Sequence, residues 1–103
     1  MSLEYADEKF SQAVYRLATH SGAIKERLAA ALLDIGSVQL RDVPEGLHDL
    51  YSDFWKSVTR NGDIITSANA MTIDEAVEAA KLIVRFANEF ELRLADQRAK
   101  NRS

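Results

Sequence analysis

The chain contains no cysteine, a single proline and four glycines that stand apart from one another. The lack of cysteine excludes disulfides, thiolate nucleophiles and thiolate zinc sites, and it fits a reducing compartment. There is also no G-x-G-x-x-G or Walker loop to cradle a phosphate. The longest apolar run, residues 28–33, is six residues long, against roughly 18 for a membrane span. Since the N-terminus has no basic-then-apolar signal segment, we expect a cytoplasmic protein that is not associated with a membrane.

The composition is that of a folded globular protein. Hydrophobic residues make up 47% of the chain and charged residues 28%, far from the low-hydrophobicity composition of disordered chains. A single domain of 103 residues buries about two-thirds of the surface that its unfolded form exposes. We therefore expect one helical bundle domain over residues 1–98, which folds without a metal or a disulfide, followed by a basic, frayed tail over residues 99–103.

Charge is divided unevenly along the chain. Residues 1–78 hold 7 basic and 13 acidic residues, a net charge of −6, whereas residues 79–103 hold 6 and 3, a net charge of +3. Cations near a helix C-terminus suit its macrodipole and keep a tail soluble. The alternative is a basic arm that contacts the phosphates of a nucleic acid or an acidic partner. This basic arm consists of Arg93, Arg98, Lys100 and Arg102.

Apolar residues recur at helical spacing in four segments, which predicts an all-α four-helix bundle. The first helix covers about residues 3–19. The second follows Ser21 as its N-cap and ends at Gly36, a residue that readily adopts positive φ. Because only about one residue separates these two helices, they should be antiparallel neighbours. Residues 37–41 are expected to be a connector, and residues 63–71 a loop.

Two capping boxes mark the starts of the third and fourth helices. Asp42 with Glu45 precedes the third helix, whose apolar face is the heaviest in the chain. Thr72 with Glu75 precedes the fourth helix, which extends to about Arg98 and is the longest. At about 1.5 Å per residue it reaches roughly 35 to 40 Å, so its far end should overhang the bundle.

The fourth helix carries an apolar stripe that is wider than one packing surface needs. At about 100° per residue, Ala79, Leu82 and Phe86 widen the stripe to roughly 220°. We interpret this width as a second packing surface, for a partner. An aromatic residue at the margin of the third helix joins it, because aromatic anchors are enriched in protein contacts. The predicted interface is Trp55, Ala79, Leu82, Phe86, Phe90 and Leu94.

Two short groupings resemble parts of chemical sites. Glu45 and His48 form an E-x-x-H pair, which di-iron carboxylate bundles use twice, but here it occurs once and no other helix offers an inward-facing acid. His20 and Ser21 are neighbours in a helix–helix turn, whereas a nucleophilic site needs a base held within reach of the hydroxyl. We interpret His48 as solvated and Ser21 as a helix cap. No catalytic, cofactor-binding or metal-ligating residue is expected, although ion binding by Glu45 and His48 stays open.

Parts of the chain between about residues 10 and 86 resemble a loose set of small bacterial helical proteins of unknown function. The resemblance lies in Leu17-Ala18-Thr19, Ile24-Lys25-Glu26-Arg27-Leu28, Asp42-Val43-Pro44-Glu45-Gly46-Leu47 and Gly62-Asp63-Ile64. These segments are helix boundaries and caps. The resemblance implies a compact helical bundle and no catalytic residue.

The sequence thus favours a small protein–protein interaction module, which forms a homodimer or docks another protein through its fourth helix. A nucleic-acid-associated regulator that uses the basic arm is the second hypothesis. An enzyme or a metal-binding protein is the third. They differ in what they require of the structure: an apolar surface, a concentrated basic face, or a cavity that holds His20 or His48 beside a desolvated carboxylate.

Overall fold

The structure, a computed structural model, describes residues 2–101, and every regular element in that range is helical. An all-α protein with a long last helix is confirmed, but there are five α-helices where the sequence predicted four. Their bounds, with two short 3₁₀ turns, are α1 Leu3–Thr19, α2 Ile24–Ile35, η1 Leu40–Asp42, η2 Glu45–Leu47, α3 His48–Val58, α4 Ile64–Ala70 and α5 Ile73–Asn101.

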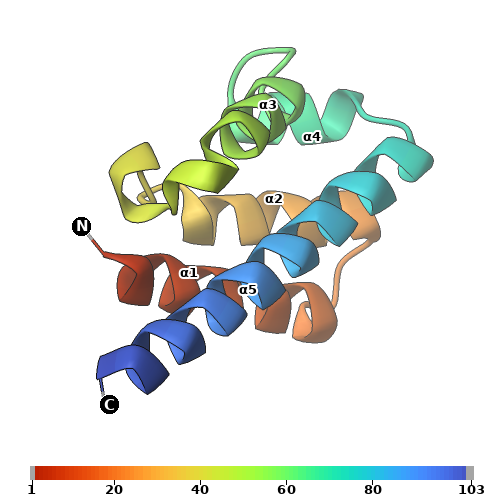
Figure 1. The fold of residues 1–103 in the computed structure, drawn as a ribbon. Coiled ribbons are helices and arrows are strands. Elements are labelled where there is room, and N and C mark those ends of the chain that lie inside the picture. The colour runs from red at the N-terminus through yellow and green to blue at the C-terminus, as the bar shows by residue number, and fades with distance from the viewer. Residues whose placement is uncertain (1, 102–103) are drawn as a thin grey trace.

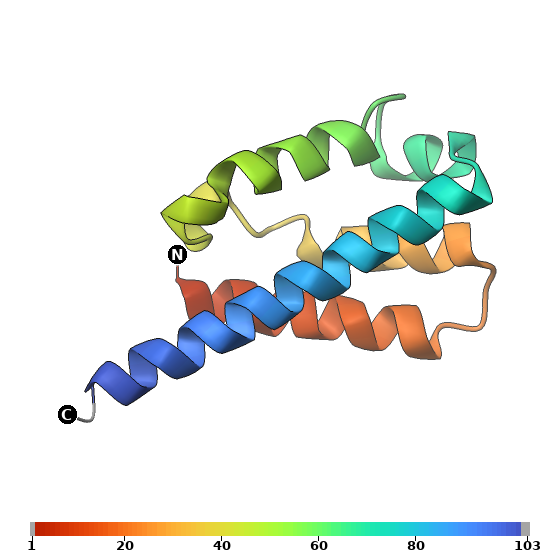
Figure 2. The ribbon, with the colours of Figure 1, turned by 45° about the vertical axis from the view of Figure 1, so that its right-hand side comes forward.

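The helices are arranged around the long α5. Helices α1 and α2 run antiparallel in one layer, and α5 crosses this layer diagonally (Figure 1). Helix α4 packs against the N-terminal part of α2, while α3 lies along the side away from α1 (Figure 2). Helix α3 contacts α4 and α5 and is joined to α2 by the segment of residues 36–47.

The α1–α2 pair is held by polar contacts as well as by its core. Arg16 donates two hydrogen bonds to the Asp34 carboxylate, from Nε and Nη2, each 3.1 Å long. Near the turn, Nη1 of Arg27 donates to the carbonyl oxygen of Leu17 at 3.1 Å. Such side-chain donors satisfy carbonyls in the last turn of a helix, which have no intrahelical partner. These bonds fix the antiparallel pairing that the short connection predicted.

Two expectations for the ends of α2 are wrong. The helix begins at Ile24 after Ala23, with no side-chain cap, so Ser21 is not its N-cap. The chain turns earlier, where Nδ1 of His20 accepts a hydrogen bond of 3.0 Å from the backbone N–H of Gly22. At the other end Gly36 has a φ of −60° and continues the right-handed turn. Among residues 2–101, positive φ occurs only at Gly62, at 117°, in the turn after α3.

The start of α3 also differs from the prediction. Oδ2 of Asp42 accepts the backbone N–H of Gln39 at 2.9 Å, so this aspartate closes the turn η1 rather than capping α3. Helix α3 itself begins at His48, after the second turn η2. The single proline, Pro44, precedes η2, where its missing N–H costs no hydrogen bond. The two turns lengthen the path from α2 to α3.

The segment predicted as a loop contains helix α4. Asp63 is its N-cap and accepts the backbone N–H of Thr66 at 2.7 Å. Ser67 and Ala68 are buried, and the Ser67 hydroxyl bonds back to the turn before α4. A helix of seven residues is unstable alone, so its packing against α2 is what keeps it folded.

Helix α5 begins as predicted. Thr72 and Glu75 form the capping box, with hydrogen bonds of 2.8 Å and 3.1 Å between side chains and backbone N–H groups. The helix spans 29 residues, about 43 Å at about 1.5 Å per residue. Residues 95–101 are all exposed, so the C-terminal end overhangs the other helices. Of the tail predicted to fray, residues 99–101 are helical, and residues 102–103 lie outside the described range.

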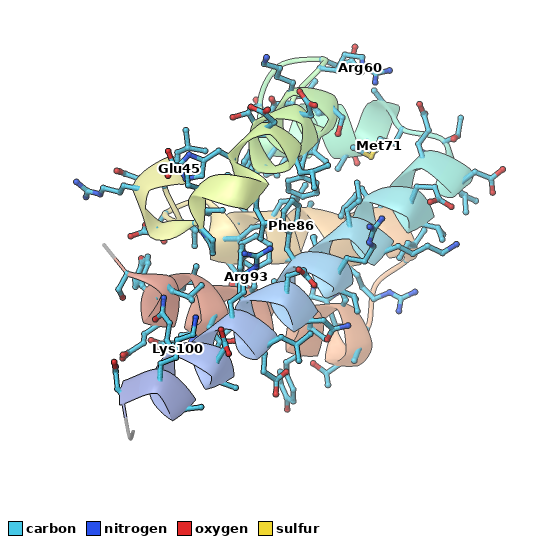
Figure 3. The ribbon with its side chains drawn as sticks, viewed as in Figure 1. Glu45, Arg60, Met71, Phe86, Arg93 and Lys100 are labelled. Carbon is cyan, nitrogen blue, oxygen red and sulfur yellow. The ribbon has the colours of Figure 1, made fainter. Side chains whose placement is uncertain are left out.

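Phe86 is the centre of the core. Its ring lies 5.8 Å from those of Phe10 in α1 and Phe90 in α5. The rings of Tyr51 and Phe54 in α3 each lie 5.6 Å from it, in edge-to-face geometry. Figure 3 shows Phe86 between α5 and the helices around it. Phe86 of α5 therefore contacts aromatic rings of both α1 and α3.

The wide stripe of α5 is explained by these neighbours. One part of it, with Ile83 and Phe90, faces α1 and α2, and another part, with Leu82 and Phe86, faces α3. Four of the predicted interface residues are less than 9% exposed, namely Ala79, Phe86, Phe90 and Leu94. The stripe is wide because it packs on two internal surfaces, which removes the reason for assigning these four to an interface.

We predict that Phe86→Ala lowers the free energy of unfolding by about 3 to 5 kcal/mol, the usual cost of truncating a buried phenylalanine. The matched control is Leu92→Ala on the same helix, because Leu92 is 66% exposed and its truncation should change stability by less than about 0.5 kcal/mol. Urea unfolding followed by circular dichroism measures both. Equal effects of the two substitutions would contradict the central place of Phe86.

Candidate docking surfaces

The E-x-x-H pair does not assemble a metal site. Glu45 is exposed, while Nε2 of His48 donates to the carbonyl oxygen of Val43 at 2.7 Å and so pins the turn before α3. Within residues 2–101 no three His, Cys, Asp or Glu side chains are grouped so that they could hold a metal ion. The role of His48 in this structure is to close the connection between η1 and α3.

The His20–Ser21 pair forms no nucleophilic arrangement. Nδ1 of His20 is occupied by the backbone N–H of Gly22, and Ser21 is exposed in the bend between α1 and α2. This histidine shapes the turn and has no hydrogen bond to the serine beside it.

The basic arm is balanced by acids on the same helix. Nη2 of Arg93 lies 3.5 Å from Oε1 of Glu89, and Nζ of Lys100 lies 3.3 Å from Oδ2 of Asp96. Figure 3 shows Arg93 and Lys100 along the C-terminal half of α5. Residues 89–101 hold three acidic and three basic side chains, so this part of the helix has no net charge. Arg102 lies outside the described residues.

Asp7 of α1 lies on the seam with this end of α5. Burial raises the pKa of its carboxyl group, the negative charge of Glu91 raises it further, and the positive charge of Arg98 opposes the change. Its Oδ1 is buried without a hydrogen-bond partner in the described part of the chain. An ionised Asp7 is therefore disfavoured in the folded state, and the exposed Arg98 partly offsets this effect through its positive charge.

An open apolar groove of about 1000 Å³ lies between α2, α3 and α4. Leu33 of α2, Leu40 of η1 and Ile65 of α4 border it, and they are 58%, 42% and 56% exposed. Trp55 and Ile64, both half-buried, line it from α3 and α4. Single exposed aliphatic residues are normal, but three around one hollow form a continuous apolar surface. We call this surface the α2–α4 groove.

The floor of the α2–α4 groove is held by buried hydrogen bonding. The Tyr51 hydroxyl donates to the carbonyl oxygen of Val38 at 2.7 Å, and both residues are buried. Burial raises the pKa of this hydroxyl, so it stays protonated as the donor. On the outer side of the same segment, the hydroxyls of Tyr5 and Ser37 lie 2.6 Å apart. The wall formed by residues 36–39 is thus fixed to both α1 and α3.

Charge is nearly absent from the α2–α4 groove. Of its 13 lining residues, only Asp63 is charged at neutral pH. The carboxylate of Asp63 is engaged, because it accepts the backbone N–H of Thr66, and this bond lowers its pKa. An occupant of the groove consequently meets apolar and neutral polar groups and a single carboxylate.

A smaller hollow of about 210 Å³ lies on the other side of α3, against α5. Its floor includes Leu82 and Phe86, and the exposed Leu50 stands at its edge. Asp53, Arg85 and Glu89 surround it with charge. The structure therefore separates the predicted interface residues, with Trp55 in the α2–α4 groove and the partly buried Leu82 in this hollow.

No pattern in the sequence groups the three aliphatic residues around the α2–α4 groove. Each of the three belongs to a different element and lies 7 to 25 positions from the next in the sequence. The available signal was local: Leu33 and Ile65 each follow an apolar residue that already occupies the buried face. A second consecutive apolar residue on a one-sided helix must face outward.

Comparison with family models, curated proteins and solved structures finds no match to this chain. The resemblance to small bacterial helical proteins stays a prediction. No helix within residues 2–101 combines the length and apolarity that crossing a membrane requires.

We predict that Tyr51→Phe lowers the free energy of unfolding by about 1 to 3 kcal/mol, because the buried carbonyl of Val38 loses its donor. Tyr15→Phe is the control, since Tyr15 is 71% exposed and should tolerate the change. Denaturant unfolding of both variants measures the difference. A neutral Tyr51→Phe would show that the hydroxyl does not fix the wall of the groove.

We predict that Asp7→Asn raises the free energy of unfolding at neutral pH. The pKa of Asp7 is raised by folding, so its ionisation penalises the folded state, and this penalty grows as the pH rises through the range above 3.8. The gain from Asp7→Asn should therefore be largest at neutral pH and vanish as the pH falls below 3.8.

Asp63→Ala is the comparison, and its effect on the free energy of unfolding at neutral pH should have the opposite sign. Its pKa is lowered by folding, so its contribution to stability is present at neutral pH and is lost as the pH falls through the lowered pKa. Thermal unfolding from acid to neutral pH follows both variants. A loss of stability on Asp7→Asn at pH 7 would contradict a pKa of Asp7 that is raised by folding.

Proposed function

We propose that the protein is a small protein–protein interaction module and that the α2–α4 groove is its docking surface. The observation that carries this proposal is the position of Leu33, Leu40 and Ile65 around one open hollow of about 1000 Å³. Exposed apolar surface of this kind is costly in water and marks contact sites in monomeric folds. Docking a partner removes it from water at about 25 cal/mol per Å² of apolar area.

The chemistry of the lining defines the partner's contact face. The only charged group in the lining is the Asp63 carboxylate, which caps α4, and the groove has no cation that could pair with a phosphate. It does offer Trp55 and aliphatic side chains, which are typical of the buried centre of protein interfaces. A partner therefore presents an uncharged, apolar face, and electrostatic attraction contributes little to the affinity.

Site-specific photocrosslinking in cells of the native source tests this function. A photoreactive amino acid replaces Ile65 in the groove or, as the control, Leu92 on α5, which is 66% exposed and lies outside the groove. We expect a discrete adduct from position 65 and none from position 92. Leu33→Glu in the same chain should abolish the adduct, because it places a charge on the opposite side of the groove.

Adducts that form equally from both positions, or that persist after Leu33→Glu, would contradict the proposed docking surface. Leu33→Glu and wild type should have the same unfolding midpoint within a few degrees, since Leu33 is exposed. This comparison separates loss of docking from loss of folding.

A further inference from the structure

We propose that Asn61 is a site of spontaneous deamidation and that one of its products loosens helix α4. This inference goes beyond the proposed docking function and does not depend on it. Asparagine is one of the thermolabile residues of proteins, and of the four in this chain only Asn61 is followed by glycine. Both residues of this pair are exposed in the turn between α3 and α4, and Figure 3 shows the neighbouring Arg60 on this turn at the edge of the molecule.

The reaction needs only this pair and water. The backbone nitrogen of Gly62 loses its proton to hydroxide and attacks Cγ of Asn61. The bond from this nitrogen to Cγ forms, the Cγ–Nδ2 bond breaks, and Nδ2 leaves as ammonia after it takes a proton from water, which regenerates hydroxide. Water then opens the five-membered imide, adding its hydroxyl to one of the two carbonyl carbons and its proton to the nitrogen. Opening at Cγ gives aspartate, and opening at the backbone carbonyl carbon gives isoaspartate.

The fold itself requires glycine after Asn61. Gly62 has a φ of 117°, the only positive φ among residues 2–101, and any larger residue would be strained there. Apart from its chain neighbours, no atom lies within 4 Å of the place where a Cβ of Gly62 would stand. The backbone nitrogen of Gly62 is therefore open to the Asn61 side chain, and the turn that makes it so is part of the fold.

One hydrogen bond restrains the attacking nitrogen. The Gly62 N–H donates to the carbonyl oxygen of Thr59 at 3.2 Å, at the long end of the range for such bonds. An exposed turn opens locally at little free-energy cost, so this bond slows the attack without preventing it. Asn88 is also exposed, but it lies within α5, where the next N–H is held in a continuous helix. Asn88 is therefore the internal control.

A single buried hydroxyl ties both residues of the pair to α4. Ser67 is 1% exposed, and its Oγ accepts the backbone N–H of Asn61 at 3.2 Å and donates to the carbonyl oxygen of Gly62 at 3.3 Å. In isoaspartate the main chain runs through the β-carbon, which adds one bond between these two groups. Their spacing then no longer matches the hydroxyl, and a buried polar group loses its partners.

Helix α4 depends on such contacts because it has only seven residues. It supplies Ile64 and Ile65 to the wall of the α2–α4 groove, so loss of the Ser67 bonds loosens this wall. The aspartate product has the ordinary backbone and keeps both bonds to Ser67. Isoaspartate, rather than the added charge, is thus the product that alters α4.

Incubation of the purified, folded chain at neutral and mildly alkaline pH, followed by peptide mass spectrometry, tests the site. We expect Asn61 to convert to aspartate and isoaspartate at least about tenfold faster than Asn88, whose following N–H is protected by the helix. The conversion should accelerate as the pH rises, because the Gly62 nitrogen must lose its proton. Asn61→Ser has no side-chain amide and should give no product at this position.

Hydrogen exchange of the α4 amides tests the effect on the helix. In the isoaspartate form, separated by chromatography, the amides of residues 64–70 should exchange at least about tenfold faster than in the unmodified chain, as expected when a buried hydroxyl loses its partners. Asn61→Asp is the matched control, because it adds the same charge without the longer backbone. Its α4 amides should exchange as in the unmodified chain.

Conversion at Asn61 that is no faster than at Asn88 would overturn the proposal. So would conversion that occurs in urea-unfolded chain but not in folded chain. Equal exchange of the α4 amides in the isoaspartate form and in Asn61→Asp would overturn the effect on α4. Each measurement uses the isolated chain, so its outcome is independent of whether a partner docks in the α2–α4 groove.

Discussion

The contact of Phe86 with the aromatic rings of α3 determines how the rest of the molecule is arranged. Helices α1 and α2 form a layer that α5 crosses, these three helices share a continuous core, and the rings of Tyr51 and Phe54 join α3 to Phe86 of α5. Each aromatic pair adds about 0.5 to 1.5 kcal/mol beyond the area that it buries. The rings of Tyr51, Phe54 and Phe86 help to set the position of α3. The position of α3 in turn determines the shape of both hollows beside it.

A hollow lies on each flank of α3. On one flank of α3, Tyr51 and Trp55 face Leu33 of α2 across the α2–α4 groove, and on the other flank Leu50 overhangs Leu82. The η1 and η2 turns lengthen the path from α2 and allow this separation. The two hollows beside α3 are therefore a consequence of how α3 packs on the other helices.

The parts of the fold that the sequence predicted are those whose signals are long or specific. The period of α1 and α5 runs over many turns, and the Thr72–Glu75 box fixes the start of α5 to the residue. Helix α4 escaped prediction because seven residues contain too little periodicity, although Asp63 is a good N-cap. Tertiary packing of Ser67 and Ala68 decides the structure there.

The interface prediction differed from the structure for a reason that sequence alone does not resolve. A stripe of roughly 220° needs two neighbours on adjacent faces, and its width is the same whether the second neighbour is α3 or another chain. The residues of the α2–α4 groove could not be predicted for a different reason. Leu33, Leu40 and Ile65 belong to separate elements, and only the fold brings them together.

The two hollows beside α3 differ in the number of charged residues that line them. The hollow against α5 is bordered by Asp53, Arg85 and Glu89, which stay hydrated when α3 and α5 are uncovered. Covering that hollow would desolvate ionised groups, which costs several kcal/mol per ion unless a partner matches each of them. Covering the α2–α4 groove desolvates aliphatic and aromatic surface, and its one carboxylate keeps its bond to Thr66. Covering either hollow removes apolar surface from water, but one lining contains three ionised groups and the other contains a single carboxylate.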